Sequence, residues 1–458
     1  MLRRASRRGT LTGSRRGFAR TQRLVNLILT YRKMRWVIAA WLTLSTILNL
    51  IDRQTLSILA PFLRDKFHLS DQGYSHVVTA FLISYTVMYS VGGKFVDWIG
   101  EKIGMAACIL WWSICTILTG LAQGPWSLGI LRFLLGLGEP GNYPAALRAT
   151  TRWFPKSERG LPIALFSSGS AVGNVLAPPL IATLTVLFGW RSAFFLPGLL
   201  GLVWLAVWLA IYRLPRNLPG ITRDELKQLE EATSYDPQTV APWFALLKNR
   251  NVLALVLSRL VSDPVWYFYV FWIPEYLKRE RGFSLTEIGL YAWIPFVAGA
   301  LGGMVGGAAS DALIRRGVSP VKARTRVLYV SAAMAPLGML TSLVHSAGAA
   351  IVLMAAMAFV VYSWFINTAA IIPDVVSDNV VGSVLGFVGT AGGAGGALFS
   401  VLIGYLLSHY SYGLAFVLAG SMHVVGACIL WSLIRDRNGR SLQAITMPLV
   451  GPGGRQVR

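Results

Sequence analysis

The stretch GKFVDWIGEK, residues 93–102, has a counterpart later in the chain, GAASDALIRR, residues 307–316. Gly93 and Asp97 stand four positions apart, and so do Gly307 and Asp311. The second pair follows the first by 214 residues, and each pair stands at the end of a long apolar run. A motif that recurs at the same place in two long segments indicates a duplicated structural unit. We therefore expect two related halves, each with this Gly-x-x-x-Asp loop as a conformational motif.

Apolar runs surround these stretches and make up most of the chain. Of the 458 residues, 54% are hydrophobic and 14% are charged, whereas charged residues form about a quarter of an ordinary soluble domain. A membrane-spanning helix needs roughly 20 apolar residues, and its backbone must satisfy its own hydrogen bonds. We expect an all-α membrane protein of twelve transmembrane helices, in the runs at residues 36–61, 75–96, 103–122, 127–147, 162–187, 193–212, 251–277, 287–310, 327–344, 349–372, 384–408 and 413–434.

The Lys and Arg residues between these runs predict the orientation. If the N-terminus is cytoplasmic, the cytoplasmic segments contain 33 of them and the external loops contain 6. Positively charged loops remain in the cytoplasm, so we expect a multi-pass protein of the plasma (inner) membrane with both termini cytoplasmic. The expected organisation is a basic N-terminal tail (1–35), a six-helix bundle (36–212), a cytoplasmic loop (213–250) with a short surface helix at DELKQLEE, a second six-helix bundle (251–434) and a cytoplasmic C-terminal tail (435–458).

The net charge of +22 comes largely from these segments and from the first 35 residues, which contain 11 Lys and Arg. This distribution is typical of a membrane protein and not of a nucleic-acid binder. The N-terminal tail lacks the apolar core of a signal peptide. Three interpretations stay open: translation starts at Met34, the tail binds lipid, or it is a targeting segment.

Chemical motifs of enzymes are missing from the sequence. The cysteines lie within apolar runs, no Cys/His spacing suits a metal, and neither a phosphate-binding glycine loop nor a nucleophile elbow occurs. We therefore expect no enzyme activity, no metal and no cofactor.

Charged residues inside the first and fourth runs are the main candidates for a functional site, because an ionisable side chain in the bilayer is costly. Asp52 and Arg53 are adjacent, so they point about 100° apart on a helix. We expect Asp52 to pair with Arg132 of the fourth run, which leaves Arg53 free, and we expect Arg132 and Glu139, seven residues apart, to line one cavity. In the alternative interpretation, these charges form salt bridges that only hold the two helices together.

Polar residues in other runs are weaker candidates. Arg259, Asp263 and Tyr267 recur at four-residue spacing and form one face of the seventh helix. Arg259 and Asp263 could instead simply neutralise each other. Tyr85 and Asn367 are polar side chains in the second and tenth runs that need buried partners. Glycines of the eleventh run, including those at 392 and 396, would let helices approach closely.

The loops and the two-half plan resemble the major facilitator superfamily. More narrowly, the chain resembles the anion:cation symporters and their hexuronate branch over residues 36–434. The segments that carry this resemblance are LNLIDRQTLSILAP (48–61), RFLLGLGEPGNYPAAL (132–147), RWFPKSERG (152–160), GSAVGNVLAPPL (169–180) and DPVWYFYVFWIPEYL (263–277).

The resemblance implies roles for individual residues. Arg53 would bind the substrate carboxylate, with Arg132 and Tyr85 nearby, while Asp52 and Glu139 would take protons. Tyr267 and Asn367 are added as candidate substrate contacts from their positions in the helices. Some relatives have Gln or Asn in the fifth and eleventh helices, where this chain has Ser170 and the region of Gly392.

We therefore expect a proton-coupled symporter that imports a sugar-acid anion, a hexuronate or an aldonate, by alternating access. Its partners would be a small organic anion, protons and the lipid bilayer, and we expect a monomer. One alternative is a proton-coupled antiporter for drugs or other organic solutes. A second alternative is a membrane sensor that transports nothing.

Overall fold

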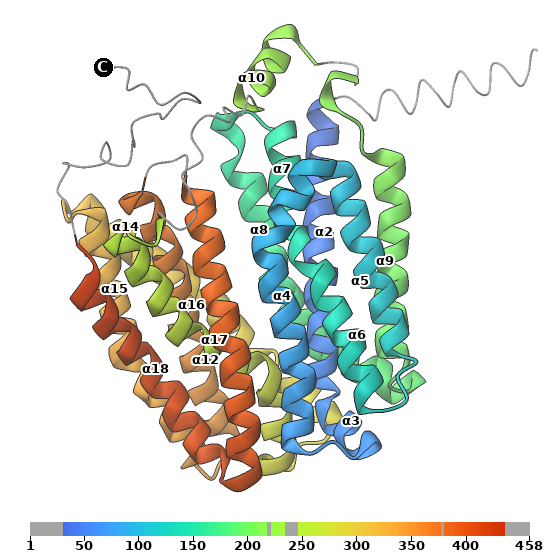
Figure 1. Ribbon diagram of the computed structural model, residues 1–458, viewed down its shortest axis with the longest axis vertical. Helices are drawn as coiled ribbons and strands as arrows, with labels where there is room; N and C mark the ends of the chain where they lie inside the picture. Colours follow the sequence, from blue (N-terminus) through green and yellow to red (C-terminus); the bar gives the residue numbers. More distant parts are fainter. Residues whose placement is uncertain (1–30, 218–220, 234–245, 377–379, 436–458) are drawn as a thin grey trace, which may run out of the picture.

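The computed structural model describes residues 31–217, 221–233, 246–376 and 380–435. Its helices form two groups that lie side by side (Figure 1). The first group contains α2 (Tyr31–Ile58), α3 (Ala60–Phe67), α4 (Asp71–Ile99), α5 (Glu101–Thr119), α6 (Pro125–Gly138), α7 (Asn142–Trp153), α8 (Gly160–Phe188) and α9 (Ser192–Ile211). The second contains α12 (Arg250–Arg281), α13 (Leu285–Tyr291), α14 (Ile294–Arg315), α15 (Pro320–Met334), α16 (Ala347–Val375), α17 (Val381–His409) and α18 (Tyr412–Leu433).

A short amphipathic helix, α10 (Arg223–Thr233), lies at one end of the molecule, and α3 lies at the opposite end (Figure 1). We call these ends the α10 end and the α3 end. The α10 helix confirms the surface helix predicted at DELKQLEE. Glu225 accepts hydrogen bonds from the backbone N–H and the hydroxyl of Thr222, both at 2.9 Å, and pairs with Arg32 at 3.4 Å. These contacts, the backbone hydrogen bond first, lower the pKa of Glu225.

Ten segments of the described chain are helices long and apolar enough to cross a membrane. The fourth expected span is interrupted, because α6 and α7 are separated by a 3-10 turn at Glu139–Gly141. Pro140 in this turn has no N–H to donate to the preceding helical turn. The ninth expected span is divided in a similar way, between α15 and a 3-10 helix at Ala335–Ser342. The expected number of twelve therefore stays a prediction.

The two groups touch along α4 and α17, which lie next to each other in Figure 1. The hydroxyls of Ser90 and Thr390 are 2.6 Å apart. Close to the α3 end, a Cβ at Gly404 would lie 2.3 Å from the Ser75 hydroxyl oxygen, so only glycine permits this approach. The predicted tail at 1–35 falls almost wholly outside the described residues, as does the C-terminal tail after residue 435.

Candidate functional site

Arg53 and Glu139 form a buried ion pair between α2 and the 3-10 turn that follows α6. The Nε and Nη2 atoms of Arg53 donate to Oε2 of Glu139 at 2.9 and 2.7 Å. Glu139 is 1% exposed, and Arg53 also reaches Asn49 Oδ1 at 3.4 Å. The break in the helix at Glu139 places its carboxylate opposite the arginine. The sequence reasoning put both residues near one site, and the structure brings them into direct contact.

The expected pairing of Asp52 with Arg132 is wrong at the level of side chains. Arg132 donates through Nη1 to the backbone oxygen of Asp52 at 3.4 Å. Both carboxylate oxygens of Asp52 are buried and accept no hydrogen bond from the described residues, although Thr116 lies nearby. Asp52 and Arg53 are neighbours on α2 and point about 100° apart: Arg53 reaches Glu139, while Asp52 lies near Thr116 of α5 and close enough to Arg132 to interact with it electrostatically. Arg53 is therefore not free, because Glu139 neutralises it.

An aromatic face covers the guanidinium of Arg53. Its Cζ atom is 4.5 Å from the ring centroid of Tyr85 and 5.7 Å from that of Phe81. A cation over a phenol ring gains an electrostatic attraction that strengthens when water is excluded. Tyr85 stands at the midpoint of α4, so the Arg53 site lies about half-way along the helices.

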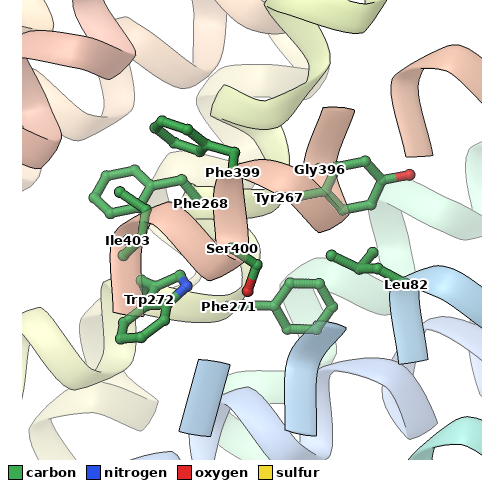
Figure 2. A pocket seen from close by; sticks show the side chains of 9 residues that line it. All are labelled: Leu82, Tyr267, Phe268, Phe271, Trp272, Gly396, Phe399, Ser400 and Ile403. Carbon is green, nitrogen blue, oxygen red and sulfur yellow. The ribbon is translucent and has the colours of Figure 1, made fainter. Parts of the chain in front are cut away.

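The second group of helices contributes Tyr267, from α12, to the neighbourhood of Arg53. Its ring stacks on Phe271 at 6.4 Å, and a Cβ at Gly396 would come within 2.3 Å of the ring. Figure 2 shows the Tyr267 hydroxyl directed away from Phe268, Trp272 and the other side chains gathered there. The space that this apolar cluster encloses is too small for a water molecule, so it is a packed contact and not a binding cavity.

Asn367 is fully buried within the second group of helices. Its Nδ2 atom donates to the Ser363 backbone oxygen at 2.9 Å, while Oδ1 has no partner among the described residues. No contact in the described chain joins Asn367 to Arg53. Tyr362, one turn earlier on α16, lies close enough to Arg53 to interact electrostatically and is next to Asn174.

Sequence reasoning missed a set of polar side chains near this site. The amide of Gln54 donates to Asn174 at 3.0 Å, and Asn142 bridges Ser45 and Thr46 at 3.0 and 3.2 Å. The signal available in the sequence was the presence of Asn and Gln within apolar runs, where an amide without a partner is costly.

The ion pair of Arg259 and Asp263 confirms the interpretation that these residues neutralise each other. They lie four residues apart on α12, with 2.5 Å between Nε and Oδ1. The guanidinium also lies 4.1 Å from the ring centroid of Phe365. A Cβ at Gly392 would lie 2.0 Å from Asp263 Oδ2, so α17 approaches this pair closely.

A network of four charges joins the two groups at the α3 end. Arg64 pairs with Asp71 at 2.8 Å and with Glu275 of α12 at 2.5 Å, and Arg279 pairs with Asp71 at 3.1 Å. Tyr74 adds a hydrogen bond to the backbone oxygen of Phe271 at 2.8 Å. Both groups of helices therefore contribute charges of both signs, and ion pairs of the network join the two groups at this end.

The two Gly-x-x-x-Asp motifs, which were expected in loops, lie within α4 and α14 close to the ends of these helices, and their surroundings differ. In the first, Asp97 pairs with Arg148, which also contacts Glu101 at 3.2 Å. In the second, Asp311 is exposed, and a nearby ion pair instead joins Arg324 to Asp374 at 2.6 Å. Close packing does not require glycine at position 93 or position 307. A Cβ at Gly93 would meet nothing within 4 Å, and a Cβ at Gly307 would meet only Ile366, at 3.7 Å.

The part of the chain that the structure describes contains no group of three His, Cys, Asp or Glu side chains that could hold a metal ion. The site consists of charged, phenolic and amide groups. It can bind an anion through arginine and exchange protons through carboxyl groups.

Comparisons with known proteins identify relatives that are named as sugar-acid transporters. The chain is 29% identical to the hexuronate transporter of Escherichia coli (strain K12) over 410 residues, which cover 88% of this chain and 95% of that protein. It is 32% identical to the galacturonate transporter of Dickeya chrysanthemi over 279 residues, covering 60% of this chain and 81% of that protein.

A solved structure shares the fold. The inward-open xylose transporter XylE from E. coli superposes with a TM-score of 0.70 at 15% identity, covering 89% of this chain and 98% of that one. The sequence profile of the Major Facilitator Superfamily matches residues 42–397. The chain therefore belongs to the Major Facilitator Superfamily, a family of multi-pass membrane transporters.

Proposed function

We propose that this protein is a proton-coupled symporter that imports a sugar-acid anion, a hexuronate or an aldonate, by alternating access. The observation that carries the proposal is the buried ion pair of Arg53 and Glu139 at the interface of the two groups of helices. The similarity to hexuronate and galacturonate transporters supports the substrate class.

The ion pair gives a physical reason for coupling. A substrate carboxylate and Glu139 would compete for the same guanidinium, so the anion binds only when Glu139 releases Arg53. A proton on Glu139 removes its charge and weakens its hold on Arg53. Asp52 is the second proposed proton site, because a buried carboxylate with no hydrogen bond is costly, and a proton removes that charge. Anion and proton would then enter the site together.

Tyrosines around Arg53 are the proposed contacts for the sugar. Tyr85 offers a ring face beside the guanidinium, and Tyr267 directs its hydroxyl away from the packed aromatic cluster. Tyr362 extends this set from α16. Phenols can accept and donate hydrogen bonds to sugar hydroxyls. Asn367 stays in the proposal as a weaker candidate, because its only hydrogen bond in the described chain is to its own helix.

The proposed transport cycle uses the ion pairs at the α3 end. If the α10 end faces the cytoplasm, as the Lys and Arg distribution predicts, the network of Arg64, Asp71, Glu275 and Arg279 closes the outer side. Breaking these ion pairs would let the halves rock and open the site outward. The glycines of α17 permit the close approach of helices that such rocking requires.

Uptake into proteoliposomes tests this function. Labelled hexuronates, aldonates and aldarates should be offered with and without an imposed inward proton gradient. We expect accumulation of a hexuronate or aldonate above equilibrium, dependent on the gradient and lost when a protonophore is added. Gradient-driven movement of an organic cation in the opposite direction would favour the antiporter, and an inert protein would favour the sensor. Either outcome would contradict the proposal.

A further inference from the structure

An apolar groove of about 310 Å³ lies on the outer surface between α15 and α18. Tyr329 and Ala333 line it from α15, and Val424, Cys428 and Trp431 line it from α18. Trp431 is 75% exposed, so the groove opens to the surroundings of the protein and not to its interior. The groove is far along the chain from Arg53 and has no part in the site described above.

An arginine continues each wall of this groove toward the α10 end. On α15, Arg326 precedes Tyr329 by three residues and Ala333 by seven, so all three share a helical face. Beyond α18 the backbone is extended at Ile434, and Arg435 follows, with its N–H donating to Asn251 Oδ1 at 2.8 Å. Both arginines are exposed. Arg250 also lies at the C-terminal end of α18, where it donates to the backbone oxygen of Ser432 at 2.8 Å.

In the part of this region that the structure describes, no acidic side chain of α15 or α18 neutralises the charge at this mouth of the groove. Residues 320–334 and 412–435 contain no Asp or Glu. Asp374, on the neighbouring α16, is already paired with Arg324 at 2.6 Å. The surface thus combines an apolar groove in the bilayer region with positive charge at the expected cytoplasmic boundary. A basic site above an apolar surface matches a lipid with an anionic headgroup.

We propose that this groove binds an anionic phospholipid of the bilayer. One acyl chain lies in the groove between Tyr329 and Trp431, and the phosphate lies between Arg326 and Arg435. Two guanidinium groups favour a headgroup with net negative charge, such as phosphatidylglycerol, over a zwitterionic one. The lipid would hold α15 against α18 and so stabilise the outer wall of the second group of helices.

Lipid binding to the purified full-length protein tests the proposal. Phosphatidylglycerol and phosphatidylcholine with identical acyl chains should be added in detergent, with bound lipid counted by native mass spectrometry and the thermal unfolding midpoint recorded. We expect phosphatidylglycerol to bind roughly 30-fold more tightly, as two surface arginines allow, and to raise the midpoint. Glycerol phosphate, which has no acyl chain, should not raise it. Equal binding of the two lipids would overturn the proposal.

Variants locate the site. Arg326→Ala with Arg435→Ala should remove the preference for phosphatidylglycerol, and Ala333→Phe should reduce binding of both lipids by filling the groove. The matched control is Arg315→Ala with Arg316→Ala, which removes the same charge from exposed positions at the end of α14. A preference that survives the first pair, or that falls equally in the control pair, would show that the lipid does not bind here.

Discussion

Arg53 gives two hydrogen bonds to a single oxygen of Glu139, at 2.9 and 2.7 Å. The second oxygen, Oε1, is buried and accepts no hydrogen bond from any described residue. Glu139 therefore occupies the planar edge of the guanidinium in the way that a bound carboxylate would. In this conformation the proposed substrate anchor is masked by a residue of the protein itself.

The first prediction concerns the shape of this anchor. Arg53→Lys keeps the positive charge but loses the planar fork that can hold a carboxylate through two nitrogens. We expect uptake to fall about 100-fold, because losing charge-assisted hydrogen bonds costs about 1.5–3 kcal/mol. Initial uptake rates and substrate affinity, normalised to protein in the membrane, would measure this.

The exposed Arg316 provides a control for this substitution, since Arg316→Lys makes the same chemical change far from the site. It should transport as the wild type does. Near-normal substrate affinity in Arg53→Lys would show that Arg53 does not bind the carboxylate.

The second prediction concerns the approach of α17 to the Arg259–Asp263 ion pair. A Cβ at Gly392 would lie 2.0 Å from Asp263 Oδ2, so Gly392→Ala must displace the helix or break the pair. Overpacking of this kind costs about 1–3 kcal/mol. We expect a lower thermal unfolding midpoint and slower transport.

Gly386 lies on the same helix, and a Cβ there would meet nothing within 4 Å. Gly386→Ala should therefore leave both the unfolding midpoint and the transport rate unchanged or slightly improved, because alanine favours the helix. If both alanine variants behaved alike, the close contact at Gly392 would have no energetic importance.

The third prediction concerns the α3 end. Arg64→Ala removes the ion pair with Glu275 that joins the two groups of helices, and the ion pair with Asp71 within the first group. We expect this end to open more often. A cysteine at Ser75, buried against Gly404, would report it through faster alkylation by an impermeant maleimide added from outside, with Cys428 replaced by serine.

Lys66→Ala is the matched control, because Lys66 is an exposed cation on the same short helix. It should leave the alkylation rate unchanged. Equal alkylation rates in Arg64→Ala and the wild type would mean that the charge network does not hold this end closed.

Much of the helical plan followed from the sequence, because hydrophobic runs of about 20 residues have few other structures available in a bilayer. The interruption at Glu139–Gly141 could also be suspected from Pro140. The sequence could not show that this interruption turns Glu139 toward Arg53, because the direction of the Glu139 side chain depends on the 3-10 turn and on where α2 packs. The spacing of Arg259 and Asp263 left open whether they pair with each other, and the structure shows that they do.

The error over Asp52 has a general cause. Helical spacing tells which residues share a face of one helix, but it does not tell which neighbouring helix that face meets. Asp52 and Arg53 were correctly placed on different faces, but Arg53, which was expected to be free, pairs with Glu139, and Asp52 has no hydrogen-bond partner among the described residues. The electrostatic interaction of Tyr362 with Arg53 was missed for the same reason, since it depends on the packing of α16 from the second group of helices.

The last prediction concerns Glu139 as a proton site. Glu139→Gln keeps the size of the side chain and resembles the protonated acid permanently. The amide holds Arg53 less tightly than the carboxylate does, because the charge on one partner is gone. We expect the variant to bind substrate and to exchange it across the membrane, since neither process needs a proton to leave. It should fail to accumulate substrate when a proton gradient is imposed.

Two assays on the same proteoliposomes separate these outcomes. Counterflow without a gradient measures exchange, and uptake with an imposed gradient measures coupling. Glu225→Gln is the control, because Glu225 is also a glutamate paired with an arginine but lies on the surface helix α10. It should behave as the wild type does in both assays. If Glu139→Gln still accumulates substrate as fully as the wild type does, the coupling proton is not carried by Glu139. The remaining candidate at the site is then Asp52, whose two carboxylate oxygens are buried without a hydrogen bond from the described residues.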